Sequence, residues 1–140
     1  MTLHFRKLNK NDYISYLILL RDFRDTAYTE EEFCNAFDTI SKTSDIIVLE
    51  EAGELIACGT IFYETKLIHN ISKVAHIEDV CIKKEYRGKR LGKELIAYMV
   101  ELAKQNGCYK VTLYCEDANV DFYRKCKFKC VGNQMIIDFR

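Results

Sequence analysis

Residues 87–93, with the sequence RGKRLGK, combine basic side chains and glycines directly before a segment of helical periodicity. The first N–H groups of a helix have no partner inside it, and the helix dipole places partial positive charge there. Glycine lets a ligand approach the backbone closely, so the stretch predicts a site for a phosphate or diphosphate. A basic loop at an ordinary helix start is the alternative interpretation. The spacing matches neither the NTPase P-loop nor the dinucleotide fingerprint.

Two adjacent carboxylates, Glu78 and Asp79, interrupt an apolar run over residues 77–82. Neighbouring residues on a regular strand face opposite sides, so both acids reach one cleft only where a bulge intervenes. The structural interpretation is a strand with solvated acids, because acids are rarely buried without a partner. The functional interpretation is a polar acceptor site beside the basic turn.

Together these features resemble the GNAT acetyltransferases, whose acyl-CoA diphosphate loop is usually written Q/R-x-x-G-x-G/A. The matching residues are Arg87, Gly88, Lys89, Leu91 and Gly92. Arg90 stands where the middle glycine is usual in that family. The family binds the diphosphate mainly through backbone N–H groups, so the resemblance implies an acyl-CoA site at this turn.

The resemblance narrows when separate blocks of the chain are taken in order. Residues 66–69, 76–80, 87–93, 107–110 and 119–123 look like the glucosamine-6-phosphate N-acetyltransferase family in both order and spacing. It covers roughly residues 55–135, and the combination of blocks is more specific than any one of them.

This resemblance implies that acetyl-CoA lies between the strand ending at Ile82 and the strand ending at Cys115. The implied cofactor contacts are Val80, Cys81, Ile82, Arg87, Gly88, Lys89, Arg90, Leu91, Gly92, Lys93, Asn119 and Tyr123. The first three would pair with the pantetheine arm, and Asn119 and Tyr123 would line the thioester end.

The resemblance also implies where the sugar phosphate binds. Its contacts would be Lys66, Leu67, Ile68, His69, Glu78 and Asp79, in a site that family members complete across a homodimer. Tyr114 occupies a position that is usually acidic in the family, and Asp138 one that is usually basic. Arg140 is therefore a candidate for the phosphate contact in place of residue 138. No metal is implied.

Acetyl transfer to an amine requires a proton acceptor for the amine and a donor for the departing thiolate. Glu78 is the candidate acceptor by position, grouped with Asp79, and a strand N–H near Val80 could stabilise the thioester oxygen. Tyr123 is the candidate donor, although an aromatic core residue is its alternative interpretation. His69 and His76 rank below Glu78 as bases. No sequence neighbour favours an acyl-enzyme at Cys81 or Cys115, so direct transfer in a ternary complex is expected.

Periodicity predicts the elements that must position these residues. The expected strands are residues 3–8, 45–50, 55–63, 74–82, 108–115 and a final strand or hairpin over 128–139. The expected helices are a first one after Asn9 or Asn11 and others over 29–40, 91–106 and 119–125, with a polar loop over 21–28. This order predicts a mixed α/β sheet with helices on its faces. The resemblance implies its GNAT form, a mostly antiparallel sheet with a central splayed strand pair and helices on both faces.

Composition restricts the class of protein. The 140 residues suit one domain over residues 1–140, and 21 basic side chains balance 21 acidic ones. A balanced charge gives no support for nucleic-acid or membrane-surface binding. The start has no apolar leader and no stretch reaches membrane length, so a cytoplasmic protein is expected. Seven cysteines without a CxxC pair indicate reduced buried thiols.

The resulting hypothesis is acetyl-CoA-dependent N-acetylation of D-glucosamine 6-phosphate, a step toward UDP-N-acetylglucosamine. A GNAT acting on another small amine, such as a polyamine or a peptide amine, is one alternative. A catalytically silent acyl-CoA-binding module is another. Retention of Glu78, Asp79, Asn119 and Tyr123 argues against the silent module, and the basic block over residues 66–69 argues against polyamines.

Overall fold

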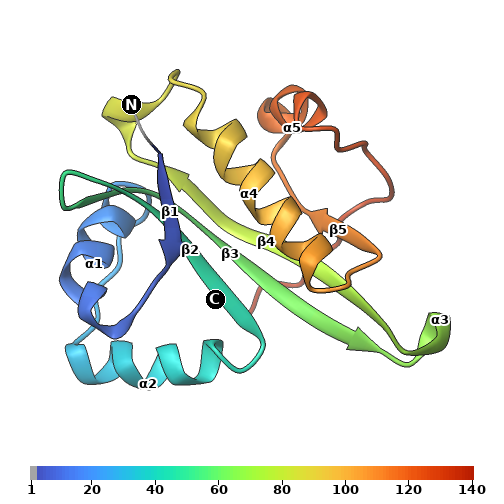
Figure 1. Ribbon diagram of the computed structural model, residues 1–140, viewed down its shortest axis with the longest axis horizontal. Helices are drawn as coiled ribbons and strands as arrows, with labels where there is room; N and C mark the ends of the chain where they lie inside the picture. Colours follow the sequence, from blue (N-terminus) through green and yellow to red (C-terminus); the bar gives the residue numbers. More distant parts are fainter. Residues whose placement is uncertain (1–2) are drawn as a thin grey trace.

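The computed structural model describes residues 3–140, and its centre is a five-stranded sheet in the order β1-β2-β3-β4-β5 (Figure 1). The strands are β1 (His4–Lys7), β2 (Ser44–Glu51), β3 (Glu54–Lys66), β4 (Ser72–Ile82) and β5 (Lys110–Leu113). The first three neighbouring pairs are antiparallel, and only β4 and β5 run parallel. The mixed, mostly antiparallel sheet expected from the sequence is therefore confirmed.

Helices cover both faces of this sheet (Figure 1). They are α1 (Tyr13–Arg21), α2 (Glu30–Ile40), α3 (Ile68–Ile71), α4 (Leu91–Gln105) and α5 (Val120–Lys125). Residues of α1 and α2 pack on one face, around Leu19 and Val48. Residues of α4 pack on the other, where Leu95 and Met99 are fully buried. The sheet thus separates two apolar cores, and each is closed by amphipathic helices.

Local sequence explains where the helices begin and end. Asn9 and Asp12 form a capping box on the 3-10 turn before α1, and Thr29 and Glu32 form another at the start of α2. Gly107, with a φ of 78°, follows the last turn of α4 as a left-handed cap. The polar segment between α1 and α2 is a loop, as expected.

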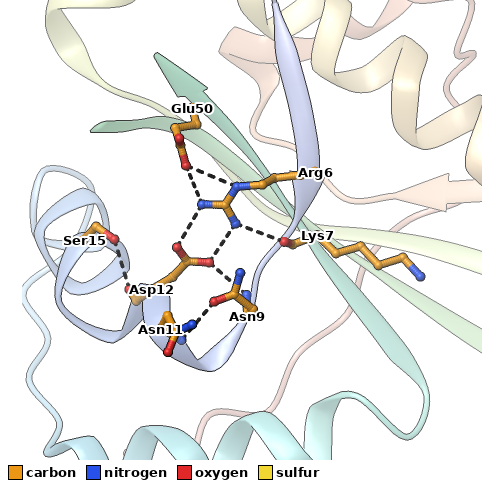
Figure 2. A network of polar contacts seen from close by, with 7 residues as sticks. All are labelled: Arg6, Lys7, Asn9, Asn11, Asp12, Ser15 and Glu50. Carbon is orange, nitrogen blue, oxygen red and sulfur yellow. Dashed lines mark hydrogen bonds and ion pairs between the residues drawn. The ribbon is translucent and has the colours of Figure 1, made fainter. Parts of the chain in front are cut away.

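A network of polar contacts joins the turn between β1 and α1 to the sheet (Figure 2). The Arg6 guanidinium on β1 donates to both carboxylate oxygens of Asp12, at 2.8 and 2.9 Å, and also to Glu50 on β2. The hydrogen bond from Arg6 lowers the pKa of Asp12, and the N–H of Asn9 adds to this effect. Asp12 is buried, so this paired carboxylate fixes the start of α1 against β1 and β2.

A bulge interrupts the pairing of β3 with β4. Cys58 lies opposite Cys81 and Thr60 lies opposite Glu78, so Gly59 faces two residues, Asp79 and Val80. Asp79 has a φ of 51°, in the left-handed region. The extra residue shifts the phase of β4, which changes the face toward which the following side chains point.

Beyond this bulge, β4 has no strand on its outer side. Its pairing with β5 ends at Ile77 and Leu113, whereas β4 continues to Ile82. The two parallel strands thus diverge at the end where α4 begins (Figure 1). This is the splayed strand pair that the resemblance implied, and it leaves one edge of residues 78–82 without a strand partner within residues 3–140.

Two expectations about the elements were wrong, and one element was not expected. β5 is shorter than the expected strand over residues 108–115. The tip of the β3–β4 hairpin contains the short α3, and His69, Asn70 and Ile71 have positive φ values. The predicted strand or hairpin over residues 128–139 does not form within the described chain, because this segment finds no strand to pair with. None of the helices within residues 3–140 has the length and apolarity needed to cross a membrane.

Candidate active site

A cleft of about 920 Å³ opens where β4 and β5 diverge. It is bounded by the end of β4, the turn before α4, the start of α4 and α5. All the expected cofactor contacts except Lys89 line it, namely Val80, Cys81, Ile82, Arg87, Gly88, Arg90, Leu91, Gly92, Lys93, Asn119 and Tyr123. Lys89 instead places its ammonium 5.1 Å from the ring centroid of Tyr86. The structure thus gathers residues from four separate segments at one place.

The amino end of α4 has no side-chain cap. The first helical hydrogen bond runs from the N–H of Glu94 to the carbonyl of Arg90, so the preceding amides of the first turn have no partner inside the helix. Gly88 has a φ of 80° and Arg90 a φ of 64°, both left-handed. With these two left-handed residues, the turn passes around the amino end of α4 without covering it. The free amides of the helix are therefore accessible to an anion.

The cleft is strongly basic at this end. Its lining includes Arg87, Arg90 and Lys93 from the turn and helix, with Lys125 and Lys127 from the opposite wall. No acidic side chain belongs to the lining within the described residues. The field of these cations adds to that of the free amides, so a diphosphate fits the site by charge as well as by hydrogen bonding.

The part of the cleft along the end of β4 is apolar, and α4 and α5 lie in close contact beside it. Val80 and Ile82 project to the α4 face, since both pack against the same core as α4. Gly92 allows α5 to approach α4 closely, because a Cβ atom there would lie 3.0 Å from Cζ of Phe122. These apolar side chains form the wall of the cleft along the end of β4. A narrow, extended ligand can lie against this wall, beside Phe122 and next to the backbone edge of β4 that has no strand partner.

Tyr123 is half-buried against Phe122 and Phe128, with ring centroids 4.9 and 5.9 Å away. Burial raises the pKa of its phenol above the ordinary value of about 10, and the neighbouring Cys115 and Cys126 add to the rise. The hydroxyl therefore stays protonated at neutral pH. This protonation state suits a hydrogen-bond or proton donor.

Glu78 and Asp79 are both exposed, immediately before the β4 residues that line the cleft. Ala75 and Ile77 pack on the α4 face and so do Val80 and Ile82, which shows the phase shift caused by the bulge at Asp79. Two adjacent acids thus stand at a backbone irregularity beside the cleft, and neither is paired in a salt bridge among the described residues. Such an arrangement can accept a proton from a bound amine.

The expected sugar-phosphate contacts are not all brought to this cleft. Lys66 lies six residues along β3 from Thr60, the partner of Glu78, so about 20 Å separates them at the rise of an extended strand. The remaining residues of this block, Leu67, Ile68 and His69, form the hairpin tip at the end of the sheet away from the start of α4 (Figure 1). Within one chain, this block and Glu78 do not form a common site.

The other expected contacts lie on the surface. Tyr114 follows β5 and is exposed, and the nearby Glu116 raises the pKa of its phenol. Arg140 is exposed and forms an ion pair with Asp138 at 3.0 Å. Neither residue lines the cleft, so the structure of one chain gives neither of them a ligand contact.

The histidines have structural partners, in line with their lower ranking as bases. His76 contacts the carboxylate of Glu64 at 2.9 Å and packs on the ring of Phe62. This hydrogen bond lowers the pKa of Glu64. His69 packs edge-on against Tyr109 at the hairpin tip.

The cleft also contains residues that the sequence analysis did not identify. They are Phe23, Tyr86, Phe122, Lys125, Cys126 and Lys127. Phe23 comes from the loop after α1, which carries no motif. The pattern of α5 could have indicated Phe122, because it precedes Tyr123 on a helix already placed at the cleft.

Comparisons with known proteins agree with this geometry. Residues 9–128 match the model of the acetyltransferase (GNAT) family. The glucosamine 6-phosphate N-acetyltransferase 1 of Dictyostelium discoideum is 41% identical over 139 residues, covering 95% of this chain and 88% of the relative. The glucosamine 6-phosphate N-acetyltransferase of Candida albicans is 37% identical over 141 residues, covering 96% and 95%.

Solved structures give the same result. The crystal structure of glucosamine-6-phosphate N-acetyltransferase from Arabidopsis thaliana superimposes with a TM-score of 0.93 at 35% identity and covers 100% of both chains. The similarity therefore includes the sheet, the diverging strands and the turn before α4. The chain belongs to the acetyltransferase (GNAT) family, in the group that contains these glucosamine 6-phosphate N-acetyltransferases.

Proposed function

We propose that this protein transfers the acetyl group of acetyl-CoA to the 2-amine of D-glucosamine 6-phosphate. The observation that carries the proposal is the uncapped, basic amino end of α4, which opens into a cleft. The β4 lining of this cleft begins at Val80, the residue that follows Glu78 and Asp79 in the chain, although neither acid itself belongs to the lining. The relatives named above act on this substrate according to their names. The cleft therefore supports acetyl-CoA as the donor, and the similarity supports glucosamine 6-phosphate as the acceptor.

Specific residues would then hold acetyl-CoA. The first-turn amides of α4, with Arg87 and Lys93, fit the diphosphate, and the open edge of residues 78–82 fits the amide groups of the pantetheine arm. Acetyl-CoA supplies an activated thioester carbonyl. Its placement along β4 would bring that carbonyl toward the bulge and its two carboxylates.

The side chains of the site have distinct roles in this proposal. Glu78, or a water molecule that it orients, accepts the proton that the amine loses as it attacks the thioester carbonyl. The N–H groups of β4 near Val80 stabilise the negative charge on the carbonyl oxygen. Tyr123 donates a hydrogen bond or proton to the departing thiolate, for which its raised pKa keeps the phenol protonated. The acetyl group passes directly to the amine.

A thiol-release assay with acetyl-CoA tests the proposal. The acceptors compared are glucosamine 6-phosphate, glucosamine, spermidine and a peptide with a free amine. We expect the sugar phosphate to have the highest kcat/KM, because unphosphorylated glucosamine lacks the group that basic residues recognise. Equal turnover of glucosamine and its 6-phosphate would contradict the assignment of the acceptor. Preference for spermidine or the peptide would favour another GNAT activity, and no turnover with tight acyl-CoA binding would favour a silent module.

We further propose that the working form is a homodimer. The segment after Cys130 exposes a series of large apolar side chains, namely Val131, Met135, Ile136, Ile137 and Phe139, between 77% and 96% exposed. β5 has no strand on its outer edge within the described residues, and Lys66 lies too far from Glu78 to meet the same substrate in one chain. A second copy would cover the apolar segment and bring its own hairpin tip to the cleft.

Sedimentation equilibrium tests this assembly. We expect twice the mass of the chain at micromolar concentration, and a monomer once Ile136 and Ile137 are both replaced by lysine. A wild-type protein that sediments as a monomer while fully active would contradict the shared site.

We place the reaction in the cytosol. All seven cysteines are free in the described chain, which agrees with a reducing compartment. A fluorescent fusion that accumulates in another compartment would contradict this placement.

A further inference from the structure

Two cysteines lie opposite each other on β3 and β4, next to the bulge. Cys58 and Cys81 are direct register partners in this antiparallel pair. Opposed residues of antiparallel strands have Cα atoms about 4.5–5.5 Å apart, which falls inside the range that a disulfide spans. Both side chains belong to the core on the α1 face, so they point to the same side of the sheet. Backbone placement therefore already satisfies the main requirement for a cross-strand disulfide.

The surroundings of the two thiols are asymmetric. Cys58 is fully buried, and its Sγ donates to the carbonyl of Asp79 at 3.8 Å. Cys81 is only 2% exposed, yet it is part of the lining of the acyl-CoA cleft, as is Phe23 from the loop after α1. A small reagent that enters the cleft can thus reach Cys81, whereas Cys58 lies behind it.

The pKa shifts of the two thiols also differ, and they favour Cys81 as the thiol that reacts first. The neighbouring Cys58 thiol lowers the pKa of Cys81 and the positive charge of Arg87 adds to this, whereas burial and the negative charge of Asp22 act in the opposite direction without cancelling it. The contact with Cys81 and burial raise the pKa of Cys58. Tyr16 on α1, whose phenol pKa is raised by burial, is a neighbour of Cys58 and opposes this rise only in part. The thiolate therefore forms first at Cys81, on the side of the cleft.

We propose that Cys58 and Cys81 are an oxidisable dithiol that closes to a disulfide when hydrogen peroxide enters the cleft in the absence of acyl-CoA. The Cys81 thiolate attacks the peroxide oxygen, the O–O bond breaks, and a sulfenic acid forms at Cys81 with release of hydroxide. The Cys58 sulfur then attacks the Cys81 sulfur, losing its proton and displacing a second hydroxide. Two thiols and one peroxide give one disulfide and two molecules of water.

The disulfide has a direct consequence for the proposed transferase site, and this part of the inference rests on the proposed function. Closing it removes the thiol hydrogen that Cys58 donates to the carbonyl of Asp79. Asp79 is the extra residue of the bulge and stands between Glu78 and the cleft. Oxidation is therefore expected to lower kcat by between about tenfold and a hundredfold, the effect of displacing a reacting group by about 1 Å. A thiol reductant should restore it.

Peptide mapping of the oxidised wild-type protein tests the dithiol directly. The reduced chain is treated with stoichiometric hydrogen peroxide, its remaining thiols are alkylated, and disulfide-linked peptides are identified by mass spectrometry. We expect one linked pair that joins the peptides containing Cys58 and Cys81, and its loss on treatment with dithiothreitol. Sulfinic acid at Cys81 without a linked peptide, or a disulfide that joins other cysteines, would overturn the proposal.

Two further experiments test the dithiol independently of the proposed transferase activity. CoA at saturating concentration should slow formation of the linked pair, and an unchanged rate in a sample shown by calorimetry to bind CoA would overturn the route through the cleft. In Cys58→Ala, excess hydrogen peroxide should convert Cys81 to its sulfinic acid. The control Cys130→Ser, treated with stoichiometric peroxide, should form the disulfide at the wild-type rate. The mapping needs no acetyltransferase activity, so a wrong acceptor assignment would leave its result intact.

Discussion

At the scale of single residues, Tyr123 offers the sharpest test of the chemistry. Tyr123→Phe keeps the ring that packs on Phe122 and Phe128 and removes only the hydroxyl. We expect kcat to fall about 100-fold, at the lower end of the range for proton transfer by a side chain, with CoA affinity unchanged. Steady-state kinetics and calorimetry check this, with Tyr98→Phe as the control, since Tyr98 stacks on Phe5 and does not line the cleft. A normal kcat would remove Tyr123 from the mechanism.

Glu78 makes a different prediction, because it acts on the amine. In Glu78→Gln the acceptor for the amine proton is lost, so we expect kcat/KM to fall about 100-fold near neutral pH. The deficit should shrink as the pH rises, because more of the sugar amine is then neutral without help. A pH series of initial rates measures this, with Glu101→Gln on α4 as the control. A deficit independent of pH would assign Glu78 to binding instead.

Sequence motifs identified most of the residues of the cleft but could not supply its backbone geometry. The glycines and basic residues of the turn before α4 follow a family pattern, and helix-end physics explains their use. The left-handed φ of Asp79 depends on the register of β4 against β3, which no local pattern encodes. Phe23 reaches the cleft only through the packing of α1, so its role depends on tertiary structure.

At the scale of elements, the network of Arg6, Asp12 and Glu50 should control the stability of the α1 face. Asp12→Asn removes one of the two carboxylates that pair with Arg6, and we expect a loss of about 2 kcal/mol in the free energy of unfolding. Urea unfolding measures it. Asp38→Asn, which breaks the exposed pair with Lys10, is the matched control and should change little.

The same network predicts a pH dependence. The pKa of Asp12 is lowered in the folded state, so its stabilisation is fully present above the unfolded pKa of about 3.9. It is lost as the pH falls through the lower folded value. The difference in stability between wild type and Asp12→Asn should therefore be constant from pH 7 to 5 and shrink below about pH 4. A difference that persists in acid would show that shape rather than charge is responsible.

The contact between α4 and α5 gives a prediction for cofactor affinity. In Gly92→Ala the new Cβ would lie 3.0 Å from Phe122, so α5 must move away from the cleft. Overpacking of this kind costs roughly 1–3 kcal/mol, and we expect about that loss in CoA binding by calorimetry. Gly107→Ala is the control, because its left-handed φ strains the chain far from the cleft. It should lower the melting temperature and leave CoA affinity unchanged.

At this scale the alternation and helical spacing of the sequence predicted the order of the elements. The capping residues explain where the helices begin and end. Thr29 and Glu32 mark the start of α2, and Gly107 marks the end of α4. The segment over residues 128–139 has the composition of a strand but no partner in its own chain. A strand needs a neighbour as well as a pattern, and sequence periodicity gives only the pattern.

At the scale of the whole molecule, the distance between Lys66 and Glu78 predicts complementation between subunits. Lys66→Ala and Glu78→Gln should each be nearly inactive alone, since each homodimer loses both shared sites. Co-expressed, they should recover about a quarter of wild-type activity, because half of the dimers are mixed and each mixed dimer retains one intact site. Activity no higher than the average of the two single variants would show that each chain works alone.

The divergence of β4 from β5 has a consequence for how the molecule responds to its cofactor. The amides of residues 78–82 that face the gap have no strand opposite them, so in the free protein they should exchange their hydrogens with heavy water rapidly. A pantetheine arm bonded along this edge would act as a temporary extra strand. Amide exchange followed with and without CoA should therefore show protection at residues 78–82 that extends into β5. The bound arm would bridge the gap between β4 and β5, so the two strands would open less often.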